Sequence, residues 1–218
     1  ITGREISSGN DIVAYAVDTT GRRIYTVHFR NLTTGEDYAD VLPEVTGNMA
    51  WANDNKTLFY TKQNLETLRW DKIYRHTLGD DPSKDVLVFE EKDDIFNCGV
   101  GKTKSQKYII IESSQTLSSE SRFLDADNPT GQFKVFLPRE RDHEYSIEDF
   151  GNSFYIRTNY KAKNFRLMKT PINKTSKEHW TDVIGHRDDV LFEGFEIFKN
   201  YLVLEERKEG LVQLRVRN

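Results

Sequence analysis

The segment from Gly99 to Thr103, GVGKT, contains the glycine, lysine and threonine by which nucleotide-binding loops hold phosphate groups. That motif needs another glycine five positions before Gly101, where this chain has Phe96. It also needs a helix after the threonine, whereas the following residues, SQKYIIIE, predict a strand. We therefore predict no nucleotide or other cofactor site. We interpret Gly99 and Gly101 as packing positions and Lys102 as a turn residue.

The string HEYSIED, His143 to Asp149, has residue types that serve in metal binding and acid–base catalysis. In a strand, however, His143 and Glu144 point to opposite faces, and the zinc motif HExxH is absent. We interpret this string as a solvated linker. The other histidines are scattered and have no cysteine partner nearby, so we predict no metal site; they are His28, His76, His179 and His186.

A serine peptidase or esterase would show its nucleophile in a G-x-S-x-G turn between a strand and a helix. The nearest string is Gly151-Asn152-Ser153, which continues with Phe154-Tyr155 in a predicted β-hairpin. We assign no catalytic residue to this chain, and no substrate-binding residue can be named from the sequence.

Composition excludes several classes of function. The net charge is −4 and charges of both signs are interspersed, so no basic face for nucleic acid is expected. No apolar run approaches the roughly 18 residues of a membrane-spanning helix. The single cysteine, Cys98, cannot form a disulfide within the chain, which favours a reducing compartment and a cytoplasmic location.

Clusters of charge are the remaining candidates. The acidic runs FEEKDD, 89–94, and LEERKE, 204–209, could attract basic peptides, but we interpret them as solvated rims. Four arginines could form ion pairs with another domain, although the sequence does not place them; they are Arg69, Arg75, Arg139 and Arg141.

The elements that must position these residues form a repeat of strands. The strongest predicted strands begin at 11, 57, 107, 153 and 200, so the spacings are 46, 50, 46 and 47 residues. Each is preceded by a leading strand and followed by one or two more. Four strands in each repeat of this length are typical of a β-propeller, in which apolar leading strands would line a central channel. A β-sandwich or an array of hairpins is the alternative.

We therefore predict an all-β chain of about five consecutive four-stranded antiparallel blades, with the last blade incomplete. The units are about 1–45, 46–94, 95–142, 143–188 and 189–218. WD40 repeats are disfavoured because WD at Trp70 and GH at Gly185 each occur once. Because the chain starts with Ile1 and ends in the strand-like LVQLRVRN, we expect a piece of a longer protein. Its uncovered blade faces would favour self-association.

Several strings resemble the propeller of the oligopeptidases B, or proteases II, of the prolyl oligopeptidase family of serine peptidases. They keep their order along the chain: MAWANDNKTLFY, DKIYRHTLG, FEEKDDIF, LPRERDHEYSIEDF, KNFRLMKT and LFEGFEIFKNYLVLEERKEGL. The resemblance implies a seven-bladed ring joined to an α/β-hydrolase domain. That domain carries the catalytic Ser, Asp and His residues, and this chain does not include it.

The resemblance also implies a function. The parent enzyme would cleave short peptides after Arg or Lys, and the propeller would gate the active site and exclude folded proteins. The residues present here would have no peptidase activity alone. The alternative is a propeller without an enzyme that serves as a scaffold for protein interactions.

Overall fold

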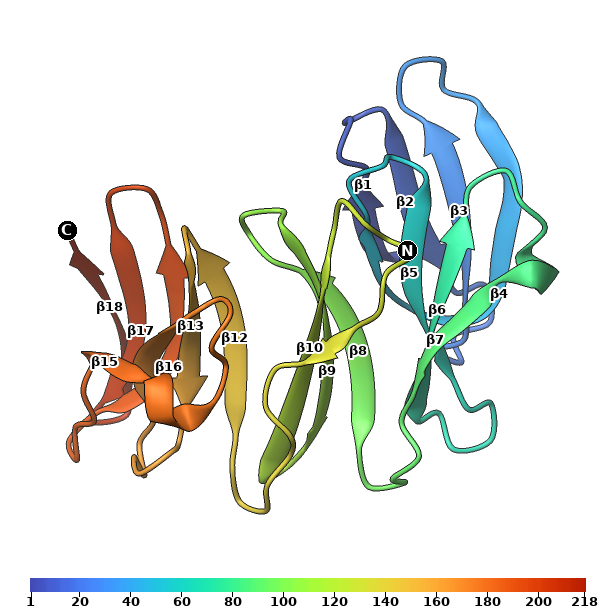
Figure 1. Ribbon diagram of the computed structural model, residues 1–218. Coiled ribbons are helices and arrows are strands. Elements are labelled where there is room, and N and C mark those ends of the chain that lie inside the picture. Colours follow the sequence, from blue (N-terminus) through green and yellow to red (C-terminus); the bar gives the residue numbers. More distant parts are fainter. The chain divides into compact units, whose positions relative to one another are not determined.

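The computed structural model describes all residues from 1 to 218, and it is built almost entirely of antiparallel strands (Figure 1). The only helical elements are two short 3-10 turns, Pro82–Lys84 and Lys177–His179. No helix is long and apolar enough to cross a membrane. The chain divides into two compact units: residues 1–115 with 122–135, and residues 116–121 with 136–218.

The strands of the first half form a sheet in simple sequence order, β1 to β7. We expected two separate four-stranded blades here. They are joined because the outer strand of the first continues into the leading strand of the second as one long strand, β4. The strands are β1 (Thr2–Ile6), β2 (Ile12–Val17), β3 (Tyr25–Asn31), β4 (Asp37–Trp51), β5 (Thr57–Gln63), β6 (Trp70–Thr77) and β7 (Val86–Glu90).

Three smaller sheets follow. The third sheet has three strands, so the last blade is incomplete, as the sequence predicted. The sheet orders are β11-β10-β9-β8, β12-β13-β14-β15 and β16-β17-β18. The strands are β8 (Asn97–Lys102), β9 (Tyr108–Gln115), β10 (Ser118–Asp125), β11 (Lys134–Val135), β12 (Tyr145–Phe150), β13 (Ser153–Thr158), β14 (Arg166–Pro171), β15 (Thr181–Ile184), β16 (Leu191–Ile197), β17 (Leu202–Lys208) and β18 (Leu211–Arg217).

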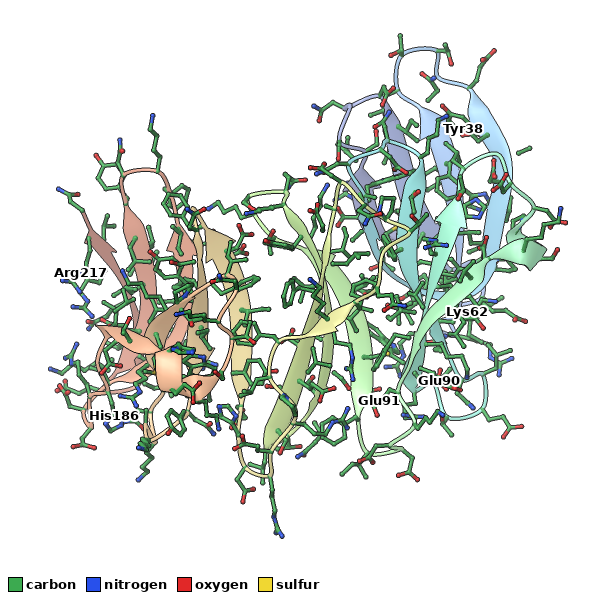
Figure 2. The ribbon with its side chains drawn as sticks, viewed as in Figure 1. Tyr38, Lys62, Glu90, Glu91, His186 and Arg217 are labelled. Carbon is green, nitrogen blue, oxygen red and sulfur yellow. The ribbon has the colours of Figure 1, made fainter.

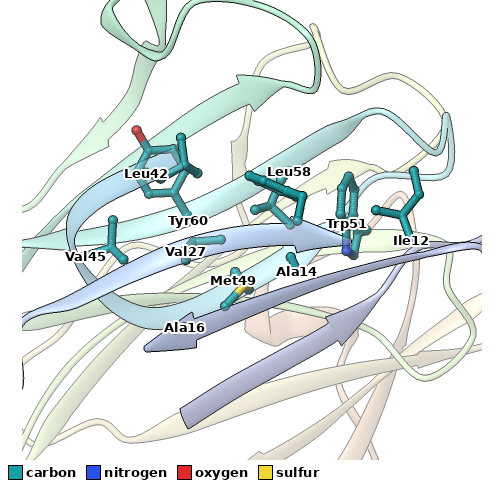
Figure 3. Close-up of a cluster of buried hydrophobic side chains, with 11 residues drawn as sticks. Ile12, Ala14, Ala16, Val27, Leu42, Val45, Met49, Trp51, Leu58 and Tyr60 are labelled. Atoms are coloured by element: carbon teal, nitrogen blue, oxygen red, sulfur yellow. The ribbon is translucent and has the colours of Figure 1, made fainter. Parts of the chain in front are cut away.

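Strand β5 shows why the apolar pattern of this chain produces stacked sheets. Leu58 and Tyr60 pack in one buried cluster, and Phe59, on the opposite face, packs in another. A strand that is buried on both faces reads as a continuous apolar run, as TLFY does. Figure 3 shows the first cluster, which β2, β3 and β4 complete with Ala14, Val27 and neighbouring side chains.

The second unit has its own apolar core. Leu167 of β14 and Leu204 of β17 are fully buried against Phe192 of β16 and Ile184 of β15. Sheets β12–β15 and β16–β18 therefore pack face to face in this unit. The leading strand of each sheet, β12 or β16, remains available to line a cavity.

Candidate functional site

Three leading strands, β1, β4 and β8, lie beside one another in the first unit, and Asn48 of β4 connects two of them. Its side-chain oxygen accepts hydrogen bonds from the Val100 amide at 2.7 Å and the Thr61 hydroxyl at 2.6 Å. Its side-chain nitrogen donates to the Val100 carbonyl at 2.9 Å. A methyl group at Gly99 would lie 3.2 Å from that oxygen, so Gly99 is a packing position, as predicted.

The same segment corrects two of our interpretations. A methyl group at Gly101 would meet nothing within 4 Å, so this glycine is not required by packing. Lys102 is the last residue of β8 rather than a turn residue. Its ammonium group donates to the side-chain oxygen of Asn53 at 2.6 Å and to the Ser8 hydroxyl at 3.0 Å. Burial lowers the pKa of Lys102, because the charged form is poorly solvated there.

A cavity of about 410 Å³ opens between these three strands. Glu5 of β1 and Lys102 of β8 are its charged residues, and burial raises the pKa of Glu5 while Lys102 opposes that rise. We expected apolar leading strands, and this pair shows that the expectation was wrong for the first unit. The remaining lining residues are Ile6, Asn48, Met49, Ala50, Trp51, Val100, Gly101 and Gln106.

A second cavity, of about 280 Å³, lies in the second unit between leading strands β12 and β16. Three carboxylates line it, those of Glu148, Glu193 and Glu196, together with one guanidinium group, that of Arg157. Arg157 stacks 3.7 Å above the centre of the Phe165 ring, and its Nε atom donates to a backbone carbonyl. Burial lowers the pKa of Arg157, and the negative charges of Glu144 and Glu193 oppose that shift. The Glu193 carboxylate also accepts a hydrogen bond from the Arg207 guanidinium group at 2.8 Å, so its charge is paired within the chain.

The HEYSIED string is not a solvated linker. His143 is 5% exposed, stacks on Tyr145 and shares a 2.9 Å hydrogen bond between Nε2 and the Thr158 hydroxyl. Burial, reinforced by the positive charge of Lys177, lowers the pKa of His143 to about 4. The ring is therefore neutral at pH 7, and it is a packed core residue rather than a ligand or base.

The acidic runs are also less exposed than predicted. Glu90 ends β7 and Glu91 follows it (Figure 2), but Glu91 is buried and accepts a hydrogen bond from the Ser113 hydroxyl. Glu206 is buried as well, and both of its carboxylate oxygens accept from the Arg215 guanidinium group. The interpretation as solvated rims is thus wrong for Glu91, which bonds to Ser113 of β9, and for Glu206, which joins β17 to β18.

All four arginines that we considered for another domain have partners in this chain. Arg69 donates to the carbonyls of Glu91, Asp93 and Phe96. Arg75 donates to the carbonyl of Pro129, and Arg139 lies 3.8 Å from the carboxylate of Glu120. Arg141 lies 3.7 Å from the carboxylate of Asp142, but its side chain is 94% exposed, so it presents its charge mainly to solvent.

A polar cluster that sequence reasoning missed lies in the core of the first unit. Nδ1 of His76 is 2.7 Å from Asp85, and Nε2 is 3.1 Å from Asp40. Tyr60 donates its hydroxyl to the same Asp85 at 2.8 Å. His76 is fully buried and bonds no serine, so the cluster has the form of a structural network and not of a catalytic triad. Asp40 and Asp85 lie 36 and 9 residues from His76 in the sequence, so no local motif marks them.

The remaining reactive side chains are not arranged for chemistry. Burial raises the pKa of the Cys98 thiol to about 12, which suppresses the reactive thiolate. Gly151 has a φ of 61° in the turn between β12 and β13, so the GNS string forms the predicted hairpin. No group of three or more His, Cys, Asp or Glu side chains is placed to hold a metal ion.

The stacked antiparallel sheets are those of a β-propeller. Residues 1–218 match the family model described as "Prolyl oligopeptidase, N-terminal beta-propeller domain", and the chain belongs to this family. The resemblance found in the sequence is thereby confirmed.

Curated relatives agree with this assignment. The chain is 44% identical over 213 residues to dipeptidyl aminopeptidase BI of Pseudoxanthomonas mexicana, covering 97% of this chain and 29% of that protein. It is 31% identical over 218 residues to Protease 2 of Moraxella lacunata, covering 99% of this chain and 31% of that protein. The chain thus spans less than a third of the length of these relatives.

Solved structures show the same fold. Oligopeptidase B from Leishmania major superposes with a TM-score of 0.89 at 29% identity, over 97% of this chain and 30% of that one. Oligopeptidase B from Trypanosoma brucei superposes with a TM-score of 0.87 at 27% identity, over 98% of this chain and 30% of that one.

Proposed function

We propose that this chain is the propeller portion of a serine peptidase that hydrolyses short peptides after Arg or Lys. In this proposal a hydrolase domain elsewhere in the protein supplies a serine activated by histidine and aspartate. The propeller controls which peptides reach that serine and excludes folded proteins. These 218 residues contribute no catalytic group.

The observation that carries the proposal is the match of the whole chain to the propeller of this peptidase family. The relatives named Protease 2 and oligopeptidase B support the oligopeptidase assignment.

The proposed location is the cytoplasm. It is supported by Cys98, the only cysteine of the chain, which is a buried free thiol. An oxidising compartment would therefore form no disulfide within these residues.

The test uses the full-length protein that contains this chain. We expect hydrolysis of an N-blocked dipeptide amide that ends in Arg or Lys, and at least about tenfold slower hydrolysis of the matched amide that ends in Ala. A folded protein of casein size or larger should resist cleavage, and the 218-residue chain alone should be inactive. If none of the amides is hydrolysed, the peptidase proposal fails, and the alternative of a propeller that serves as a scaffold for protein interactions is favoured.

A second specificity has an observation in its favour, the 44% identity to a protein named dipeptidyl aminopeptidase BI. A dipeptidyl aminopeptidase releases two residues from a free amino terminus. The matched amide without the N-terminal block distinguishes the two specificities. Cleavage that requires the free amine would favour the aminopeptidase, whereas equal cleavage of blocked and free amides would favour the oligopeptidase.

A further inference from the structure

The cavity of the first unit has the size of a small-ligand site. Its volume of about 410 Å³ falls within the roughly 300–1,000 Å³ that is usual for such sites. Its lining is mainly polar, and the Trp51 indole of β4 donates to the Glu5 carbonyl at 3.1 Å, which holds β1 in place. Three strands that lie far apart in the sequence therefore build one preformed cavity.

Two opposite charges line this cavity without neutralising each other. Glu5 and Lys102 attract each other through space, but they form no direct ion pair. The Lys102 ammonium group instead donates to two neutral oxygens, those of Asn53 and Ser8. An ammonium group has three donors, so one N–H remains for a ligand.

Both charges of the cavity can be reached by a ligand that brings its own charges. Lys102 is half-buried and burial lowers its pKa, which means that its ionised form is poorly solvated, whereas Glu5 is an exposed residue of β1. The carboxylates of Asp54 and Asp127 act on Lys102 from nearby and only partly offset this effect. A ligand with one cationic and one anionic end would supply a partner for each group.

We propose that this cavity binds a short zwitterionic peptide, with its α-ammonium group on Glu5 and its α-carboxylate on Lys102. The proposal rests on the proposed function in one respect, because a peptidase channel is where such peptides are supplied as substrates or products. Gly101 lines the cavity, and the space over it is open, because an added methyl group would touch nothing within 4 Å.

The test is calorimetric titration of the full-length protein with the dipeptide Ala-Ala, which has both charges and no basic side chain. N-acetyl-Ala-Ala lacks the ammonium group, and Ala-Ala amide lacks the carboxylate. Since a hydrogen bond to a charged group corresponds to roughly a tenfold to hundredfold change in affinity, each blocked dipeptide should bind at least about tenfold more weakly.

Variants locate that binding. Lys102→Met and Gly101→Val should each weaken Ala-Ala binding by about tenfold or more, the first by removing the carboxylate partner and the second by filling the cavity. In Glu5→Gln, Ala-Ala and its acetylated form should bind equally. Lys107→Met is the matched control, because Lys107 lies over the Tyr108 ring outside the cavity and its loss should change nothing.

The outcomes separate this proposal from the proposed function. If Ala-Ala does not bind, or binds equally to the protein and to Lys102→Met and Gly101→Val, the cavity proposal is overturned even when Arg amides are hydrolysed. If binding is lost in those two variants and retained in Lys107→Met, the cavity proposal stands even when no amide is hydrolysed.

Discussion

Two buried histidines of this chain prefer opposite charge states because their neighbours differ. Burial opposes a charge on His76, but hydrogen bonds and charges from Asp85 and Asp40 outweigh it and raise its pKa. Its contribution to stability is therefore fully present below pH 6.5 and declines as the pH rises through the folded-state pKa. His143 has no carboxylate hydrogen bond, and its pKa falls to about 4.

For His143 the pH dependence of stability has the opposite sign. Between about pH 6.5 and pH 4 the unfolded chain binds a proton at this ring and the native chain does not, so acidification favours unfolding. We expect this ring to lower the free energy of unfolding by about 1–2 kcal/mol between pH 7 and pH 5, after allowance for residual solvation. Urea denaturation at both pH values would measure it. His143→Gln, which cannot titrate, should show a smaller loss, and an equal loss in the variant would contradict the assignment.

Individual residues were the least predictable level. Glu5, Asn48 and Lys102 come from three strands that are 43 or more residues apart, and only stacking of the strands brings them to one cavity. The sequence reasoning interpreted Lys102 as a turn residue because a Lys-Ser-Gln turn follows it closely. The buried carboxylates Glu91 and Glu206 were hidden in the same way, since a run of charges does not show which member faces inward.

At the scale of elements, the sequence was far more informative. Apolar runs bounded by polar turns placed β2, β5, β9, β13 and β17 and their spacing, because a sheet buried on both faces needs continuous apolar strands. The continuity of β4 was missed. Pro43 and Gly47 predict a break, but the strand absorbs them through a register shift between Val45 and Met49.

The crossing of β1 and β4 depends on glycine. Gly47 has a φ of 84°, and a methyl group on it would lie 3.1 Å from the Cβ atom of Ala16 and 2.9 Å from the methyl group of Thr2. We expect Gly47→Ala to cost about 2–3 kcal/mol, from backbone strain and overpacking together. Thermal or urea unfolding measures this loss.

Gly21→Ala is the control for that experiment. Gly21 has a similar φ of 73°, but a methyl group there would meet nothing within 4 Å. It should therefore cost only the strain, about 1 kcal/mol. Equal losses in the two variants would show that strain alone matters and that the approach of β1 to β4 does not.

At the scale of the whole chain, the last sheet presents an apolar face. Residues of a strand alternate between faces, so Val212, Leu214 and Val216 share one side of β18. They are 48%, 71% and 61% exposed, and β18 pairs only with β17. The opposite side carries Arg215, which is paired with buried Glu206. Exposed apolar rows on an edge strand favour association between chains.

We therefore expect the 218-residue polypeptide, prepared by itself, to self-associate through this face. Light scattering coupled to size-exclusion chromatography should show a mass that rises above 25.4 kDa as the concentration increases. Leu214→Lys places a charge in the centre of the apolar row and should shift the population toward the monomer by about tenfold in dissociation constant, since desolvating a lysine opposes burial. Gln213→Lys adds the same charge on the other side, opposite Glu206, and should leave association unchanged. A monomer at all concentrations, or equal effects of the two lysines, would exclude this face as the contact.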